Sequence, residues 1–126
     1  MRYLGIDYGK KRIGLAFGER GLVCPLTVYQ NNNNVFDKIQ EICLNEAVDR
    51  VVLGMSQDLK KEIEFFAQGL AKRIGLPIVF QDESLTTREA VDKMLVSSTR
   101  QRARREKIDA IAAAQILTAY FLDKKD

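Results

Sequence analysis

Three acidic residues, Asp7, Glu83 and Asp109, each lie beside an apolar segment of the chain. A carboxylate in such surroundings is costly unless a cation or hydrogen-bond donors stabilise it. Each also has an ordinary structural explanation. Asp7 could cap a turn, Glu83 could point into solvent as its strand ends, and Asp109 could interact with the positive end of a helix. If the three meet in space, their mutual repulsion requires a cation.

The composition limits which chemistry these acids could perform. The chain has no histidine, and its two cysteines, Cys24 and Cys43, lie far apart without a CxxC spacing. Cys/His zinc sites and histidine general bases are therefore excluded, and we expect both cysteines to be reduced core residues. Oxygen ligands alone select Mg²⁺ or Mn²⁺. Acid clusters that hold such ions stabilise the attacking and leaving oxygens of a phosphodiester.

Basic residues accompany the acids and suggest a polyanionic ligand. Lys10, Lys11 and Arg12 follow Asp7 closely, and "TRQRARREK" at 99–107 carries five cations against one acid. The net charge is only +3, so the basic residues are concentrated rather than abundant. A solvated basic loop is the alternative interpretation. Next to an acidic site, however, such a run suits nucleic acid, because each phosphate contact releases counterions.

The pattern of apolar residues predicts the elements that must position these side chains. Three strands joined by short connections should form an antiparallel meander, the third with a proline bulge or at an edge. Helices and strands then alternate, because apolar residues recur at helical spacings between short continuous apolar runs. The expected strands are 2–8, 12–19, 21–29, 50–55 and 77–83, and the expected helices are 34–48, 63–74, 86–95 and 108–122.

This order predicts an α/β fold within one domain spanning residues 1–126. Strands joined by single helices pair in parallel through right-handed crossovers. We therefore expect a mixed five-stranded sheet, with three antiparallel strands followed by parallel ones and helices on both faces. Asp7 and Glu83 would end parallel strands, and Asp109 would begin a helix packed on the sheet. All three would then converge at one edge of the sheet, where ligands of such folds bind.

Alternation along the first strand predicts which face Asp7 occupies. It shares a face with Tyr3 and Gly5, whereas Tyr8 points to the other side. By the same rule Asp82 should point away from Glu83 and is the weaker candidate.

Four segments resemble the YqgF family, Holliday-junction-resolvase-like proteins also described as pre-16S rRNA nucleases, which have a ribonuclease-H-like fold. They are "GIDYGKKRIGLAF" (5–17), "VVLGM" (51–55), "DESLTTREA" (82–90) and "KIDAIAAAQIL" (107–117). The resemblance implies a metal-dependent phosphodiesterase whose catalytic and metal-binding acids are Asp7, Glu83 and Asp109. It implies these substrate-binding residues: Lys11, Arg12, Thr86, Thr87 and Arg88.

The chain departs from the family pattern at two places. Ser84 stands where the family usually has an arginine, and the segment after the fourth strand, "GMSQDLKKEIEF", lacks the usual proline and glycine. These changes concern activity and specificity more than the fold.

We expect a nuclease acting on structured nucleic acid, with Mg²⁺ or Mn²⁺ as cofactor and 5′-end processing of pre-16S rRNA as its task. The alternatives are a Holliday-junction resolvase, or a nucleic-acid-binding factor in translation or transcription that does not cleave. The partner is pre-rRNA or branched DNA, and the protein is a monomer or a homodimer. The first segment also resembles the phosphate loop of actin-like ATPases, but those proteins clasp the nucleotide between two such domains.

The chain contains no apolar run near the roughly 18 residues that cross a membrane. The first residues run directly into a strand, so we expect no secretory signal and a cytoplasmic protein.

Overall fold

The computed structural model describes residues 1–82 and 101–123, the side chains of 101–108 excepted. It contains five strands and three helices within those residues. The strands are β1 (Arg2–Tyr8), β2 (Arg12–Glu19), β3 (Leu22–Gln30), β4 (Arg50–Met55) and β5 (Ile78–Asp82); the helices are α1 (Val35–Asn45), α2 (Lys60–Ile74) and α4 (Gln101–Asp123).

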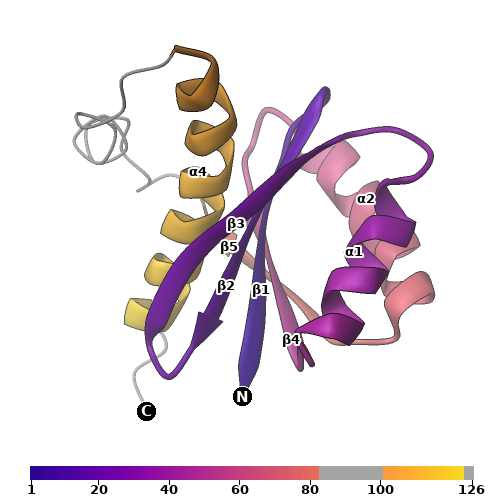
Figure 1. Ribbon diagram of the computed structural model, residues 1–126. Coiled ribbons are helices and arrows are strands. Elements are labelled where there is room, and N and C mark those ends of the chain that lie inside the picture. Colours follow the sequence, from indigo (N-terminus) through magenta and orange to yellow (C-terminus); the bar gives the residue numbers. More distant parts are fainter. Residues whose placement is uncertain (83–100, 124–126) are drawn as a thin grey trace.

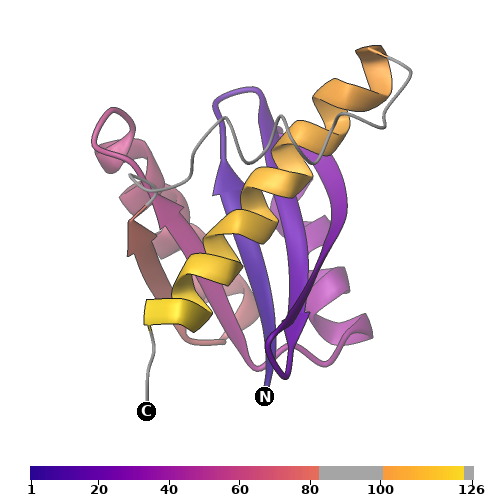
Figure 2. The ribbon, with the colours of Figure 1, turned by 90° about the vertical axis from the view of Figure 1, so that its left-hand side faces the viewer.

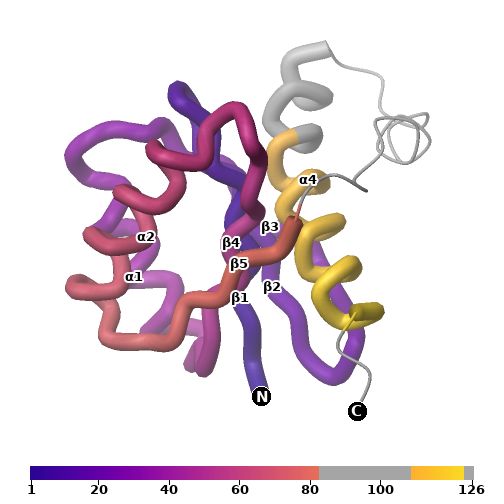
Figure 3. Tube along the Cα trace, turned by 180° about the vertical axis from the view of Figure 1, so that it is seen from behind, coloured from indigo at the N-terminus to yellow at the C-terminus, as the bar shows by residue number. Residues whose placement is uncertain are grey.

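The strands form one mixed sheet in the order β3-β2-β1-β4-β5. β1 pairs antiparallel with β2, and β2 with β3, whereas β4 runs parallel to both β1 and β5. Helices α1 and α2 lie side by side against one face, and α4 covers the other (Figures 1 and 3). Figure 2 shows that α4 crosses its face obliquely. The predicted fold class is therefore confirmed.

Two hydrophobic cores lie on opposite faces of the sheet. On the side of α1 and α2, Leu4 and Ile6 are fully buried, and on the side of α4, Tyr3 and Val52 pack with the helix. Because β1 and β4 are covered on both faces, their sequences read as nearly continuous apolar runs. Alternation along β1 consequently directs odd-numbered residues toward α4.

The third strand has both features that its proline predicted. β3 lies at the edge of the sheet, and its pairing shifts where Leu15 faces Thr27 but Ala16 faces Pro25, so that Leu26 is the extra residue of a bulge. Proline has no N–H to donate, which restricts it to such places. The expectation for Cys24 is wrong, however: it is exposed, because edge strand β3 is only partly covered there, whereas Cys43 is buried in α1.

The last helix begins earlier than the sequence pattern predicted. Instead of starting at residue 108, α4 starts at Gln101 and includes the basic segment from there onward. Arginine, lysine, glutamine, glutamate and alanine are strong helix formers, so this segment needs no apolar stripe to be helical. The helix expected over 86–95 lies outside the described residues. Among the helices that are described, none is long and apolar enough to cross a membrane.

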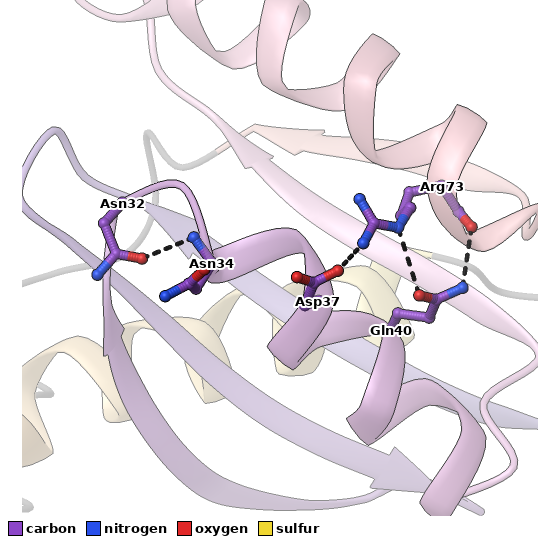
Figure 4. Close-up of polar contacts among 5 residues, drawn as sticks. All are labelled: Asn32, Asn34, Asp37, Gln40 and Arg73. Atoms are coloured by element: carbon purple, nitrogen blue, oxygen red, sulfur yellow. Dashed lines mark hydrogen bonds and ion pairs between the residues drawn. The ribbon is translucent and has the colours of Figure 1, made fainter.

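Polar contacts join α1 to α2 (Figure 4). Arg73 near the end of α2 forms an ion pair with Asp37, and its Nε donates to Gln40 Oε1 at 3.4 Å. Helix α2 then ends as predicted at Gly75, whose φ of 67° suits glycine.

Candidate active site

Asp7 lies near the carboxyl end of β1, half-buried and on the face covered by α4. Two residues earlier, Gly5 allows the helix to approach the sheet closely. A Cβ atom at Gly5 would lie 2.8 Å from the carbonyl oxygen of Ala113. The absence of a side chain at this position thus fixes the distance at which α4 packs.

The structure brings Asp109 to Asp7 through a glycine on the neighbouring strand. Gly14 of β2 is the cross-strand partner of Asp7, and a Cβ atom at Gly14 would lie 2.0 Å from the carbonyl oxygen of Asp109. Directly paired residues of antiparallel strands have Cα atoms about 4.5–5.5 Å apart. The backbone of Asp109 therefore rests on the strand position immediately beside Asp7. The backbone positions of these two acids are therefore close together.

The position of Asp109 within its helix differs from the prediction. The helix begins at Gln101, so Asp109 lies in its third turn rather than at its start. The helix dipole favours anions only within the first turn. Interaction with the helix terminus is therefore excluded as the explanation for this acid.

Arg12 compensates the charge of Asp109. Its Nε donates to Asp109 Oδ2 at 2.6 Å, and the two side chains are 47% and 22% exposed. Arg12 is the first residue of β2, directly after the turn that follows Asp7. A predicted substrate-binding residue and a predicted catalytic acid thus contact each other.

Lys11 lies in that turn and is exposed. The turn is tight, since a Cβ atom at Gly9 would lie 2.5 Å from the carbonyl oxygen of Arg12. It is held by Asn31, which donates its backbone N–H to Lys11 O and its Nδ2 to Gly9 O, both at 2.9 Å. Sequence reasoning missed this support, although the run of asparagines that contains it stands out in the chain.

The other predicted site residues lie outside the described part of the chain; these are Glu83, Thr86, Thr87 and Arg88, together with Ser84. The strand that precedes them is described. Gly54 pairs with Gln81 in β5, and continuing the β1–β4 register by one residue places Asp7 beside Gly54. Gln81 donates to Asp123 of α4 at 2.8 Å, which places it on the same face as Asp7. Asp82 consequently points to the opposite face, as predicted.

The donor set suits a hard divalent cation. Asp7 and Asp109 offer carboxylate oxygens at one edge of the sheet, and the chain has no histidine to compete. Within the described residues, no group of three or more potential ligands is arranged to bind a metal. The third expected ligand, Glu83, immediately follows the last described residue of β5. The chemistry of these carboxylates therefore fits the expected ions.

The chain matches one family model and resembles named proteins of other bacteria over nearly its whole length. The family model described as "RuvX: Holliday junction resolvase" matches residues 1–123. A protein of Desulforudis audaxviator named "Putative pre-16S rRNA nuclease" is 37% identical over 137 residues, covering 99% of this chain and 96% of its own. A protein of the same name from Listeria monocytogenes serotype 4b is 31% identical over 134 residues, with coverages of 95% and 96%.

Solved structures with the same fold are much more distant in sequence. Thermus thermophilus RuvC, in complex with a Holliday junction substrate, superposes with a TM-score of 0.58 at 14% identity, covering 98% of this chain and 96% of that one. The Fowlpox virus resolvase, also in complex with Holliday junction DNA, gives 0.61 at 9% identity, with coverages of 97% and 99%. At such identities the likeness concerns the fold.

Proposed function

Because the chain belongs to the family described as RuvX: Holliday junction resolvase, we propose that it is a metal-dependent nuclease that hydrolyses phosphodiester bonds of structured nucleic acid. The fold is ribonuclease-H-like, and we propose that residues 1–126 form one domain. Its task is 5′-end processing of pre-16S rRNA, which the names of relatives at 31% and 37% identity support. The observation that carries the proposal is the packing of Asp109 on Gly14, directly beside Asp7.

The acids have the role of holding divalent ions. Asp7, Glu83 and Asp109 would bind Mg²⁺ or Mn²⁺, which when bound stabilises charge on the attacking and leaving oxygens of the phosphodiester. The family resemblance supports Glu83 for this role, and the position of Asp7 and Asp109 on one edge of the sheet supports the other two.

Cationic and hydroxyl groups would orient the nucleic acid. Arg12 stands against Asp109 with about half of its side chain exposed, so a substrate phosphate can reach its guanidinium. Arginine binds phosphate through several N–H donors in a fixed plane. Lys11 in the adjoining turn adds a point charge, and the resemblance assigns Thr86, Thr87 and Arg88 to the substrate as well.

Resolution of Holliday junctions is the second candidate function, which the description of the family favours. A resolvase cuts two strands symmetrically, so that function would require a homodimer. Processing of an RNA end makes no such demand and is compatible with a monomer.

The test is cleavage of three substrates by the purified protein with Mn²⁺ or Mg²⁺: an RNA carrying the precursor 5′ segment of 16S rRNA, a DNA duplex and a four-way DNA junction. We expect the RNA to be cut and Asp7→Asn to reduce cleavage to the protein-free background while the protein stays folded. Asp82→Asn is the matched control, an acid at the same sheet edge on the other face, and should cleave normally. Equal cleavage by Asp7→Asn would contradict the proposal.

Two other outcomes of this assay select the alternatives. Cleavage confined to the four-way junction identifies a resolvase. Tight binding without product under either metal identifies a factor that does not cleave.

A further inference from the structure

A cavity of about 370 Å³ opens beside the end of β1, on the face of α1 and α2. Its walls come from Tyr8 of β1, the loop Asn31–Asn33, and Phe65 and Phe66 of α2. Tyr8 directly follows Asp7, and successive residues of a strand point to opposite faces. The cavity therefore lies at the same edge of the sheet as the acids, on the other side.

The floor of the cavity is aromatic and firmly packed. The buried ring of Phe66 contacts Tyr8 at 5.0 Å and Phe36 at 5.3 Å between ring centroids. Next to it, Phe65 is 80% exposed. Phe65 does not belong to the apolar stripe that buries α2 against the sheet, so its ring contributes little to the core. An aromatic ring in this position is available to stack on a planar ligand.

The rim of the cavity carries amide groups. Asn32 uses its Oδ1 to accept the N–H of Asn34 at 2.9 Å (Figure 4), so the N–H groups of its amide are the part that can face a ligand. Asn33 is exposed beside it. An asparagine amide offers both donors and an acceptor, which match the polar edge of a nucleobase.

The charges around the cavity indicate how a nucleotide would be oriented. Glu62 lines the cavity and is paired with Lys10 at 4.0 Å between Nζ and Oε2. Its carboxylate disfavours a phosphate inside but can accept from the exocyclic amine of a base. Lys10, which is paired with Glu62, and Lys61, one helical turn before Phe65, favour a phosphate outside the cavity. The base would enter and the backbone would stay at the rim.

The cavity is joined rigidly to the acidic site. Asn31, which lines the cavity, holds the β1–β2 turn through its hydrogen bonds to Gly9 and Lys11. The same turn leads from Asp7 to Arg12. A strand that bends around this edge would therefore meet both sites within a short distance.

We propose that this cavity binds one unpaired base of the substrate strand, stacked on Phe65, with the adjoining phosphate near Lys10. This inference rests on the proposed function in that the substrate is a nucleic acid. Its consequence is specificity: the protein recognises a junction between paired and unpaired nucleotides rather than a continuous duplex. A cavity of this volume is at the small end of ligand sites, which suits a single base.

The test compares two RNA hairpins that differ in one feature, a single-stranded extension of four nucleotides. Affinity is measured by fluorescence anisotropy without divalent ions, and 2-aminopurine placed at successive positions of the extension reports stacking through quenching. Wild-type protein should bind the extended hairpin more tightly and quench one position. Phe65→Ala should lose the quenching and weaken binding of the extended hairpin about 5- to 100-fold, with the blunt hairpin unaffected. Phe65→Trp should retain both.

A control variant distinguishes the loss of the Phe65 ring from the loss of any exposed apolar side chain. Leu44 is 75% exposed on α1, away from the cavity, so Leu44→Ala should bind both hairpins like the wild type. The inference is overturned if Phe65→Ala binds and quenches like the wild type. It is equally overturned if Phe65→Ala loses affinity for both hairpins alike. It is also overturned if the wild type does not prefer the extended hairpin; the expected occupant of the cavity would then be an apolar side chain of another protein.

These outcomes can be distinguished from failure of the proposed function. If the wild type cleaves and Asp7→Asn does not, but Phe65→Ala binds normally, only the base-binding role of the cavity fails. If no substrate is cleaved while quenching depends on Phe65, the nuclease proposal fails and the base-binding cavity stands.

Discussion

Arg12 and Asp109, 97 residues apart in the sequence, are joined by a hydrogen-bonded ion pair of 2.6 Å between Nε and Oδ2. The pair links the first residue of β2 to the third turn of α4, at the place where the helix backbone rests on Gly14. It explains how a carboxylate on a packed helix face is tolerated before any other cation is bound. The same guanidinium is half exposed, so it is available to a phosphate that approaches the acids.

The coupling energy of this pair should be measurable by a double-mutant cycle. With Arg12→Gln and Asp109→Asn, we expect a coupling of about 0.5–1 kcal/mol in urea unfolding, since Asp109 is only 22% exposed. The matched control is the pair Arg2–Glu19, which is longer at 3.4 Å and 39% exposed on both sides. Its coupling should be smaller. A coupling near zero for Arg12–Asp109 would show that this contact does not stabilise the fold.

Gly14 should tolerate no side chain. A Cβ atom there would meet the backbone oxygen and carbon of Asp109 at 2.0 and 2.4 Å, and neither atom can move without displacing α4. We expect Gly14→Ala to lower the free energy of unfolding by about 3 kcal/mol and to abolish cleavage.

Gly18→Ala is the control for this prediction, on the same strand and the same face. Its Cβ atom would meet the ring edge of Phe121 at 2.9 Å, which is a side chain that can shift. The loss of stability should be about 1 kcal/mol, with cleavage retained. If both alanines cost the same in urea unfolding, the close approach of Asp109 to the sheet is not what limits this position.

The sheet and the proximity of the Asp7 and Asp109 positions could be predicted from the sequence, because both depend on the spacing of apolar residues along the chain. Alternation fixes the face of Asp7, and continuous apolar runs identify β1 and β4 as central strands. The beginning of α4 was not predictable from its apolar stripe, since the residues before Asp109 are charged and are helical by propensity. The Arg12–Asp109 pair was not predictable either, because no local pattern reports a contact across 97 residues.

Phe65 is visible in the sequence as an aromatic residue outside the apolar stripe of α2, but the sequence does not indicate what its ring contacts. In α2 the buried residues include Ile63, Phe66, Ala67 and Leu70, and an aromatic residue outside that stripe contributes little to the core. Its partner groups, the asparagines of the loop before α1, lie about 30 residues earlier in the chain. Only the folded sheet, which places that loop beside the start of α2, reveals the cavity that they share.

The two cysteines should differ sharply in reactivity. Burial raises the pKa of the Cys43 thiol from 9.0 to about 11, whereas Cys24 is exposed on β3. Because the thiolate is the reactive form, we expect one thiol to react rapidly with Ellman's reagent near about pH 8 in the folded protein and the second only after unfolding. Cys24→Ser should remove the rapid phase. A rapid phase that persists in Cys24→Ser would contradict the burial of Cys43.

The same raised pKa makes stability depend on pH in the alkaline range. Below the ordinary value of 9.0 both the folded and the unfolded chain carry the proton, and the stabilisation is fully present. As the pH rises from 9.0 through about 11, the unfolded chain loses its proton first, so the folded state loses stability. Urea unfolding of wild type and Cys43→Val across this range should show a steeper loss of stability in the wild type than in the variant.

The basic start of α4 should act on affinity rather than on cleavage itself. The helix backbone runs continuously from Gln101 to Asp109, so the arginines of this segment lie on the same helix as Asp109. Arg102 and Arg105 are three residues apart, a spacing that makes them neighbours along a helix. If they bind phosphates, Arg102→Gln/Arg105→Gln should weaken binding to all sequences alike. The slope of log K against log salt should then fall by about 0.9 for every duplex phosphate that is no longer neutralised.

A matched pair of cations distinguishes a local interaction from an effect of net charge. Arg20 lies in the turn between β2 and β3, and Lys72 in the last turn of α2, both exposed and both at the end of the sheet opposite Asp7. Arg20→Gln/Lys72→Gln removes the same amount of charge as Arg102→Gln/Arg105→Gln. It should leave the slope of log K against log salt unchanged, because interactions between exposed charges are screened beyond about 10 Å at moderate salt. Equal slopes for the two double variants would mean that the basic segment attracts nucleic acid only through the overall charge. A reduced slope confined to the Arg102/Arg105 variant places phosphates along the start of α4, so that the strand passes over Asp109 on its way to the edge of the sheet.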